Sequence, residues 1–282
     1  MYTLEAENEL GQILQMTDNE RYVISSIVGL DPPDSTINTT RNAGDDGSVF
    51  NSSSVGNRTI TITLAINAPA EENRINLYTY FKAKKGVRLH YTNDTRDVYA
   101  DGFVQRINIG FFDKKQVAQI VIICPNPFFT ATANKVVDFS QVTSNFEFPF
   151  DIPSAGIAFS VITPVNNQDL INGGDVDTGF IIKINAIGAV TNPQIYNVET
   201  SEFFGLNISL ADGDEVTINT KRKQKSVTLL HNGTTSNIIG DLMEGSTWLQ
   251  LKPADNLFSI TASSYPEHMV ISCIVSELFE GV

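Results

Sequence analysis

The side chains that most often perform chemistry are few in this sequence, and they are scattered. The three histidines are His90, His231 and His268, and none lies four residues from another or beside a cysteine. A zinc site requires several such ligands at short, regular spacing. The sequence also contains no GxSxG, P-loop or GxGxxG pattern, so no nucleophile or phosphate cradle is indicated. These patterns predict no catalytic, metal or cofactor site, although a triad assembled from distant residues stays open.

Acidic residues next to glycines could have either of two functions. Three groups occur: Asp45 and Asp46; Asp175 and Asp177; and Asp212, Asp214 and Glu215. Two carboxylates could act as the acid and base of a glycosidase, or oxygen ligands could bind calcium. None of the groups has EF-hand spacing. Aspartate beside glycine is typical of turns, where its side chain bonds nearby backbone, and we therefore interpret the groups as turns.

Two further clusters suggest binding to a partner. A basic run lies between two expected strands and consists of Lys221, Arg222, Lys223 and Lys225. A set of aromatic residues could form a sugar-stacking platform: Tyr196, Phe204, Trp248 and Tyr265. A solvated hairpin tip is the favoured interpretation of the basic run, and aromatic residues more often pack in cores or interfaces. Both clusters are therefore interpreted first as structural.

Composition limits the classes of partner. The 282 residues include 19 Lys and Arg against 32 Asp and Glu, a net charge of -13. Stable nucleic-acid binding rests on basic residues that neutralise phosphates, and anionic membranes attract basic segments, so neither partner is expected. The N-terminal sequence has no signal-peptide pattern, which predicts synthesis in a cytoplasm. Cys124 and Cys273 lie within apolar runs and are expected to be buried and unpaired.

Alternation of apolar and polar residues dominates the chain and predicts β-strands. The clearest case is residues 58–66, RTITITLAI, with isoleucine and leucine on one face. The expected strands cover residues 21–30, 58–66, 87–91, 98–109, 116–124, 157–162, 180–187, 203–210, 215–219, 226–230, 248–251, 257–262 and 269–275. One helix is expected over residues 70–85, because acidic residues open it and Lys82, Lys84 and Lys85 close it before Gly86. The pattern predicts β-sandwiches or barrels.

Two stretches break this pattern. Residues 31–57 form a long polar segment rich in Gly, Asp, Asn and Ser, and we expect an irregular loop there that is functional or mobile. Residues 126–153 contain several prolines, which interrupt strand pairing. We place a domain boundary in this second stretch, giving domains of residues 1–130 and 131–282.

The motifs of the first half, in order, resemble the N-terminal domain of siphophage-type distal tail proteins. The matching features are Gly29–Leu30 after a strand, Asp46–Gly47 in the polar segment, Asn57–Arg58 opening TITITLAI, the helix, and CPNPFF at 124–129. No single motif is specific, and their order and spacing carry the resemblance.

The second half resembles the galectin-like C-terminal domain of the same family. The matches are Asn192–Pro193 with Ile195 and Asn197, Gly213–Asp214–Glu215 leading into Ile218–Asn219–Thr220, Ser226–Val227, and Trp248–Leu251 with Pro253 and Asp255–Asn256. Ala254 stands where the family often has glycine. A type I turn, which accepts alanine after proline, is expected there. Residues 136–178 match poorly.

The resemblance implies a mainly β protein, with an N-terminal β-sandwich or split barrel carrying one helix, followed by a galectin-like β-sandwich. It implies a non-enzymatic virion protein that forms a homo-hexameric ring. The ring would join the tail tube protein to the tail-tip hub protein, and the outer domains could anchor a receptor-binding protein. Exposed strand edges favour such assembly. The candidate assembly-interface loop is 31–57, with Asp31, Arg41, Asp45, Asp46, Gly47 and Arg58.

Two other classes of function remain open from the residues alone. A two-domain β-sandwich adhesin could bind cell-surface carbohydrate through the aromatic residues. A glycoside hydrolase could use Asp212 or Glu215. The tail-hub interpretation accounts for most of the chain, whereas each alternative rests on a few residues.

Overall fold

The computed structural model describes residues 2–44, 46–111, 115–144, 160–164 and 167–282, with backbone alone at 140–144 and 160–164. It is mainly β, which confirms the expected fold class. The described chain divides into two compact units, Met1–Ala133 with Leu278–Val282, and Asn134–Glu277. The expected domain division at 130/131 differs from this in two respects, because the boundary lies at 133/134 and residues 278–282 return to the first unit.

The first unit is built on one extended sheet whose strand order is β2-β1-β7-β8-β9-β6-β3, with β10 and β25 joined to it through β8. Its strands are β1 (Thr3–Asn8), β2 (Ile13–Gln15), β3 (Tyr22–Val28), β6 (Arg58–Ile66), β7 (Gly86–Thr92), β8 (Asp97–Ile109), β9 (Gln116–Cys124), β10 (Phe129–Ala131) and β25 (Leu278–Phe279). A separate pair, β4 (Ser35–Thr40) and β5 (Val49–Val55), forms a hairpin.

Strand β8 curls this sheet. Its first half pairs with β7 and its second half with β9, and the register shifts between Val104 and Arg106. Such a bulge bends a strand and increases its twist. Strand β6 lies between β3 and β9 and alternates strictly, with Ile60, Ile62 and Leu64 fully buried. This bend is consistent with the split barrel implied by the resemblance.

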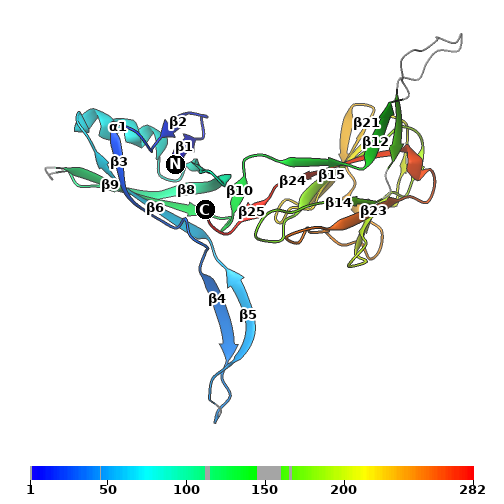
Figure 1. The fold of residues 1–282 in the computed structure, drawn as a ribbon, viewed down its shortest axis with the longest axis horizontal. Coiled ribbons are helices and arrows are strands. Elements are labelled where there is room, and N and C mark those ends of the chain that lie inside the picture. The colour runs from blue at the N-terminus through cyan, green and yellow to red at the C-terminus, as the bar shows by residue number, and fades with distance from the viewer. Residues whose placement is uncertain (1, 45, 112–114, 145–159, 165–166) are drawn as a thin grey trace, which may run out of the picture. The chain divides into compact units, whose positions relative to one another are not determined.

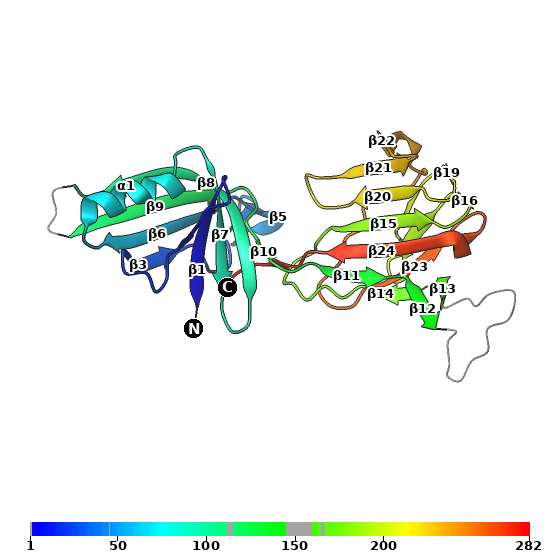
Figure 2. The same ribbon diagram turned by 90° about the horizontal axis from the view of Figure 1, so that it is seen from above.

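Helix α1 (Ala70–Tyr80) is shorter than the expected 70–85. It packs through Leu77, which is fully buried, and the Tyr22 hydroxyl of β3 donates to the carbonyl of Asn73 at 2.7 Å. The lysines lie beyond the helix, where the amide of Lys85 bonds the carbonyl of Lys82 in a turn. Gly86 therefore opens β7 and does not cap the helix. Figure 2 shows α1 over the strands of the first unit.

The second unit contains a six-stranded and a four-stranded sheet among its described residues, in the orders β11-β24-β15-β20-β21-β22 and β14-β23-β17-β18. Its elements are β11 (Lys135–Asp138), β12 (Ser140–Ser144), β13 (Ser160–Pro164), β14 (Asn167–Asp169), β15 (Phe180–Ala186), β16 (Val190–Thr191), β17 (Gln194–Asn197), β18 (Phe203–Gly205), β19 (Ser209–Leu210), β20 (Glu215–Asn219), β21 (Ser226–His231), β22 (Thr234–Asn237), β23 (Leu257–Thr261) and β24 (Met269–Val275), with 3-10 turns η1 (Ile239–Asp241) and η2 (Pro266–His268).

The core of the second unit lies between these two sheets. Phe180 of β15 and Phe258 of β23 meet edge to face, with ring centroids 5.5 Å apart, and both are fully buried. Inward residues alternate along β15 and β24, as in sheets that pack face to face. Figure 2 shows the strands of the larger sheet side by side. This sandwich is consistent with a galectin-like domain.

The strand expectations differ from the structure at several places, and several strands, among them β1 and β17, were not among those expected. Residues 203–210 form two short strands, β18 and β19, and residues 248–251 form no strand apart from one bridge, between Leu251 and Thr178. Part of the expected strand 157–162 lies outside the described residues. The largest difference is at residues 31–57, which form the β4–β5 hairpin and not an irregular loop.

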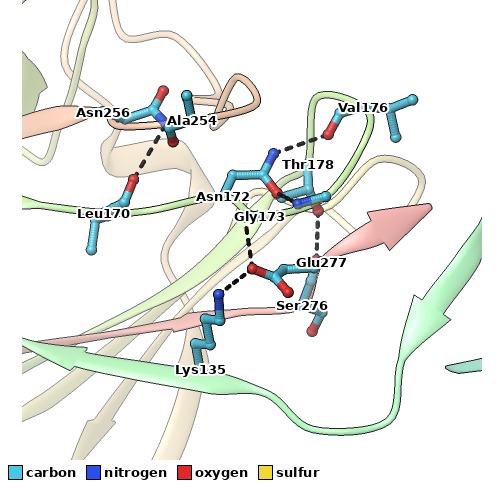
Figure 3. A network of polar contacts seen from close by, with 11 residues as sticks. Lys135, Leu170, Asn172, Gly173, Val176, Thr178, Ala254, Asn256, Ser276 and Glu277 are labelled. Carbon is cyan, nitrogen blue, oxygen red and sulfur yellow. Dashed lines mark hydrogen bonds and ion pairs between the residues drawn. The ribbon is translucent and has the colours of Figure 1, made fainter. Parts of the chain in front are cut away.

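The turn after Pro253 is not type I. Ala254 has φ of +84°, which is the value of the third residue in a type II turn and disfavours any side chain. The turn is held by buried neighbours, which Figure 3 shows. The carbonyl of Ala254 accepts from the amide of Asn172 and from Nδ2 of Asn256, both at 3.0 Å. These two asparagines are almost fully buried. Their hydrogen bonds stabilise a backbone conformation that is unfavourable for alanine.

Replacement of Ala254 by glycine is therefore expected to stabilise the protein. Relief of the left-handed conformation is worth about 1 kcal/mol in the free energy of unfolding. The prediction is tested by denaturant unfolding followed through the fluorescence of Trp248, the single tryptophan of the chain, which lies in the second unit. Ala211→Gly, at a position without positive φ, is the control and should not stabilise. A lower unfolding midpoint for Ala254→Gly would contradict the argument.

Candidate assembly interface

The β4–β5 hairpin projects from the sheet of the first unit, as Figure 1 shows. Every residue of its two strands is exposed. The strands pair antiparallel from Ser35 with Val55 to Thr40 with Val49. A two-stranded ribbon without a third strand or a packed face is marginally stable in water, so this hairpin has the properties of a segment that binds to another surface.

A bulge gives the hairpin one apolar face. Asn38 pairs with Ser52 and Thr39 with Phe50, which leaves Asn51 unpaired. Residues paired across the ladder share a face and alternate along each strand. Phe50 therefore lies on the same face as Ile37 and Val55, whereas without the extra residue it would lie on the opposite face.

The opposite face of the hairpin is mainly polar. Nδ2 of Asn38 donates to Oγ of Ser52 at 3.1 Å, and Nδ2 of Asn51 donates to Oγ1 of Thr40 at 2.6 Å. On the apolar face, Ile37 and Phe50 are each 61% exposed and Val55 is 38% exposed. Large apolar side chains gathered on one side of an exposed ribbon mark an interaction surface more than isolated ones do.

The root of the hairpin is fixed by Arg58, the first residue of β6. Its guanidinium donates to four backbone carbonyls: Gly29 at 2.5 Å, Asp31 at 2.7 Å, Pro127 at 2.6 Å and Glu280 at 2.5 Å. Arg58 is only 3% exposed and lies over the Phe129 ring, 4.4 Å from its centroid. Burial lowers the pKa of Arg58 from its usual value.

The residues expected at the assembly interface lie in different parts of the hairpin and its root. Arg41, Asp46 and Gly47 are exposed at the tip between β4 and β5. Asp31 is exposed at the root, and Asp45 lies outside the described residues. Arg58 differs from the expectation because it is buried and bonded within the chain, and so it positions the hairpin instead of meeting a partner.

Sequence reasoning missed the apolar residues of the hairpin. Ile37, Phe50 and Val55 are separated by polar residues and by the tip, so no strand-like alternation links them. The available signal was composition, because STINTT is rich in threonine and isoleucine, which favour strands, and VFNSSSV contains two valines and a phenylalanine. The bulge that brings the three side chains to one face is visible only in the structure.

The acidic group that contains Asp214 and Glu215 makes contacts within the second unit. Asp214 is 5% exposed; one carboxylate oxygen lies 2.6 Å from Nδ1 of His231 and the other accepts from the amide of Ala211 at 2.8 Å. Glu215 contacts Thr217 and Lys183. These bonds fit the turn interpretation. Among the described residues, no group of three or more His, Cys, Asp or Glu could hold a metal ion.

The aromatic residues form separate contacts. Trp248 packs on Phe204 with ring centroids 5.2 Å apart, and Phe204 is buried. Tyr265 stacks on His268, with ring centroids 5.4 Å apart. Within the basic run, Nζ of Lys221 donates to Ser276 at 2.8 Å, and Lys225 lies over Trp248. These contacts are packing within the chain, whereas Arg222 and Lys223 of the basic run are exposed and Tyr265 is 56% exposed.

Cys124 and Cys273 are buried and unpaired, as expected. Burial raises the pKa of Cys124 to about 11, with Arg58 opposing the shift, and it also raises the pKa of Cys273. Both thiols are therefore protonated and inert near neutral pH. Within the described part of the chain, no helix is long and apolar enough to cross a membrane.

Comparison with known proteins agrees with this architecture. Residues 11–124 match the family model of the phage tail protein RIFT-related domain, and residues 173–271 match that of the siphovirus-type tail component, C-terminal domain. Together the two matches cover about three quarters of the chain, and each falls within one unit. No curated protein sequence matches the chain.

Two solved structures have the same fold over the whole chain. The SPP1 Dit protein, described as a paradigm of the hub adsorption apparatus in phages infecting Gram-positive bacteria, is 14% identical, with a TM-score of 0.71 and 99% of each chain covered. A chain of the phage P2 baseplate in its activated conformation with Ca is 11% identical, with a TM-score of 0.53 and 100% of each chain covered.

The two family domains, in this order and on this fold, define a structural component of a phage tail. The chain belongs to the siphophage-type distal tail proteins. Its place is therefore the virion tail.

Proposed function

We propose that six copies of the chain form a ring that joins the distal end of the tail tube to the tail-tip hub. The proposal is supported by the family and by the hairpin, whose apolar face with Ile37, Phe50 and Val55 has no cover within the described protomer. Burial of such side chains is the main favourable term in protein association. The hairpin of each copy binds the neighbouring copy in the ring.

A second copy suits the hairpin because a ring needs two different complementary surfaces on one chain. The hairpin is one of these surfaces. Strand β3 is an edge strand of the described sheet of the first unit. Its side chains Val23 and Val28 are 51% and 63% exposed. An exposed strand edge with apolar residues accepts a further strand or apolar face. The first unit thus carries both the inserted element and a surface that can receive one.

The other partners follow from this placement in the tail. The ring contacts the tail tube protein on one side and the tail-tip hub protein on the other, and the second units can carry a receptor-binding protein. Assembly takes place in the cytoplasm of the host bacterium. The protein is structural and not an enzyme. Its net charge of -13 disfavours retention of DNA, because phosphates are repelled by excess carboxylate.

The proposal is tested on the full chain by native mass spectrometry and negative-stain electron microscopy. A mass of six protomers, with a central hole in class averages, is the expected result. Two stacked rings would give twelve protomers and would equally support the proposal. A monomer at micromolar concentration, with no larger species in either measurement, would overturn it.

A further inference from the structure

The segment Leu278–Val282, called here the returning segment, comes back to the first unit after the chain has completed the second. Its strand β25 pairs with β10, with Phe279 opposite Phe129 and Leu278 opposite Thr130. The amide of Val282 donates to the carbonyl of Leu30 at 3.2 Å. The returning segment therefore ends beside the residues where the hairpin leaves the sheet.

Arg58 joins the returning segment to the hairpin. Its Nη1 donates to the carbonyls of Gly29 and Asp31, at the start of the hairpin, whereas its Nη2 donates to the carbonyl of Glu280. A guanidinium is planar and offers five donors in a rigid fork. When one acceptor strand is displaced, the buried guanidinium keeps a donor without a partner, and its hold on the hairpin root is weakened.

A second arginine also binds the returning segment. Arg96 donates to the carbonyl of Gly281, and its guanidinium lies over the ring of Phe279, 4.4 Å from the centroid. Gly281 also touches the hairpin root directly, since a Cβ atom at this position would lie 2.9 Å from Cδ of Pro32. There is therefore no room for a side chain at Gly281 where the returning segment packs on the hairpin root.

We infer that the returning segment is a latch that holds the hairpin in position, and that Arg58 is the positioning residue through which it acts. This inference rests on the proposed role of the hairpin in ring formation. The latch follows the second unit in the chain, so it reaches the hairpin root only after the second unit has been synthesised. Ring formation thereby depends on completion of both units, which prevents partial chains from entering the ring.

The test uses Gly281→Val in the full chain, because this change obstructs the seat without altering Arg58 or the hairpin strands. Amide hydrogen exchange at residues 29–31, and at Val282, whose amide donates to the carbonyl of Leu30, is expected to accelerate by at least about tenfold, with β6 and β9 unchanged. The fraction of chains in rings should fall at equal protein concentration. Gly240→Val is the matched control, since a Cβ atom there meets nothing within 4 Å.

A second variant, Arg58→Lys, keeps the positive charge but cannot bond four carbonyls in the same geometry. It should accelerate the same amides and reduce ring formation. Unchanged exchange at the root in both variants would overturn the latch, even if the wild-type chain forms rings. If the wild-type chain forms no rings, the proposed function fails, while exchange at the root still decides whether the latch exists.

Discussion

The triple variant Ile37→Ser, Phe50→Ser and Val55→Ser is expected to be a folded monomer. Each of these side chains contributes about 1.5–3 kcal/mol when buried in an interface. Together they account for roughly 4.5–9 kcal/mol at each contact, and every 1.4 kcal/mol changes a dissociation constant about tenfold. Loss of all three should therefore weaken the contact by more than about a thousandfold. Sedimentation velocity at several concentrations measures the effect.

The hairpin supplies its own control for this experiment. Val49 is 58% exposed and pairs with Thr40, which places it on the opposite face from Phe50. Val49→Ser should leave the ring intact, whereas Phe50→Ser alone should weaken it measurably. The circular dichroism of all variants should match the wild type, because exposed side chains contribute little to the folded protomer. Equal effects of the two single substitutions would contradict the assignment of the apolar face.

The second large effect is expected from Gly29→Val, at the point where the hairpin begins. Gly29 has φ of +97°, and a Cβ atom there would lie 2.2 Å from the carbonyl oxygen of Thr59. The clashing atom belongs to the backbone of β6 and cannot rotate away. Left-handed strain combined with displacement of a central strand should lower the free energy of unfolding by about 3–5 kcal/mol.

This effect is measured best in the triple hairpin variant, so that loss of assembly does not add to loss of stability. Far-UV circular dichroism follows both units, whereas the fluorescence of Trp248 follows the second unit. If the unfolding transition seen only by circular dichroism shifts, and the transition seen by Trp248 fluorescence does not, then the first unit is the one destabilised. Gly56→Val, at the other end of the hairpin, is the control, because a side chain there meets nothing within 4 Å. Similar losses in the two variants would refute the steric argument.

The two predictions separate the roles of the hairpin and its root. The strands carry the surface that binds a neighbour, and they can be altered without unfolding the protomer. The root, with Gly29 and Arg58, belongs to the interior of the first unit and sets the direction in which the strands leave it. Substitutions at the root should therefore affect folding and assembly together, whereas substitutions on the apolar face should affect assembly alone.

The sequence by itself determined the strands whose side chains alternate. Residues 58–66, 116–124, 215–219 and 269–275 were expected as strands and match β6, β9, β20 and β24 at both ends. Alternation is a local property, since burial of one face repeats every second residue in any sheet. The order of short motifs likewise indicated the tail-protein family, because motif order is read along the chain.

The tertiary structure decided the features that depend on distant partners. The buried role of Arg58 rests on carbonyls at residues 29, 31, 127 and 280, and a backbone carbonyl has no signature in sequence. The apolar face of the hairpin depends on one bulge, which changes the face of Phe50 without changing composition. The strained turn at Ala254 depends on Asn172, far away in the chain. Local periodicity records which residues are buried, whereas only the folded chain records which groups meet.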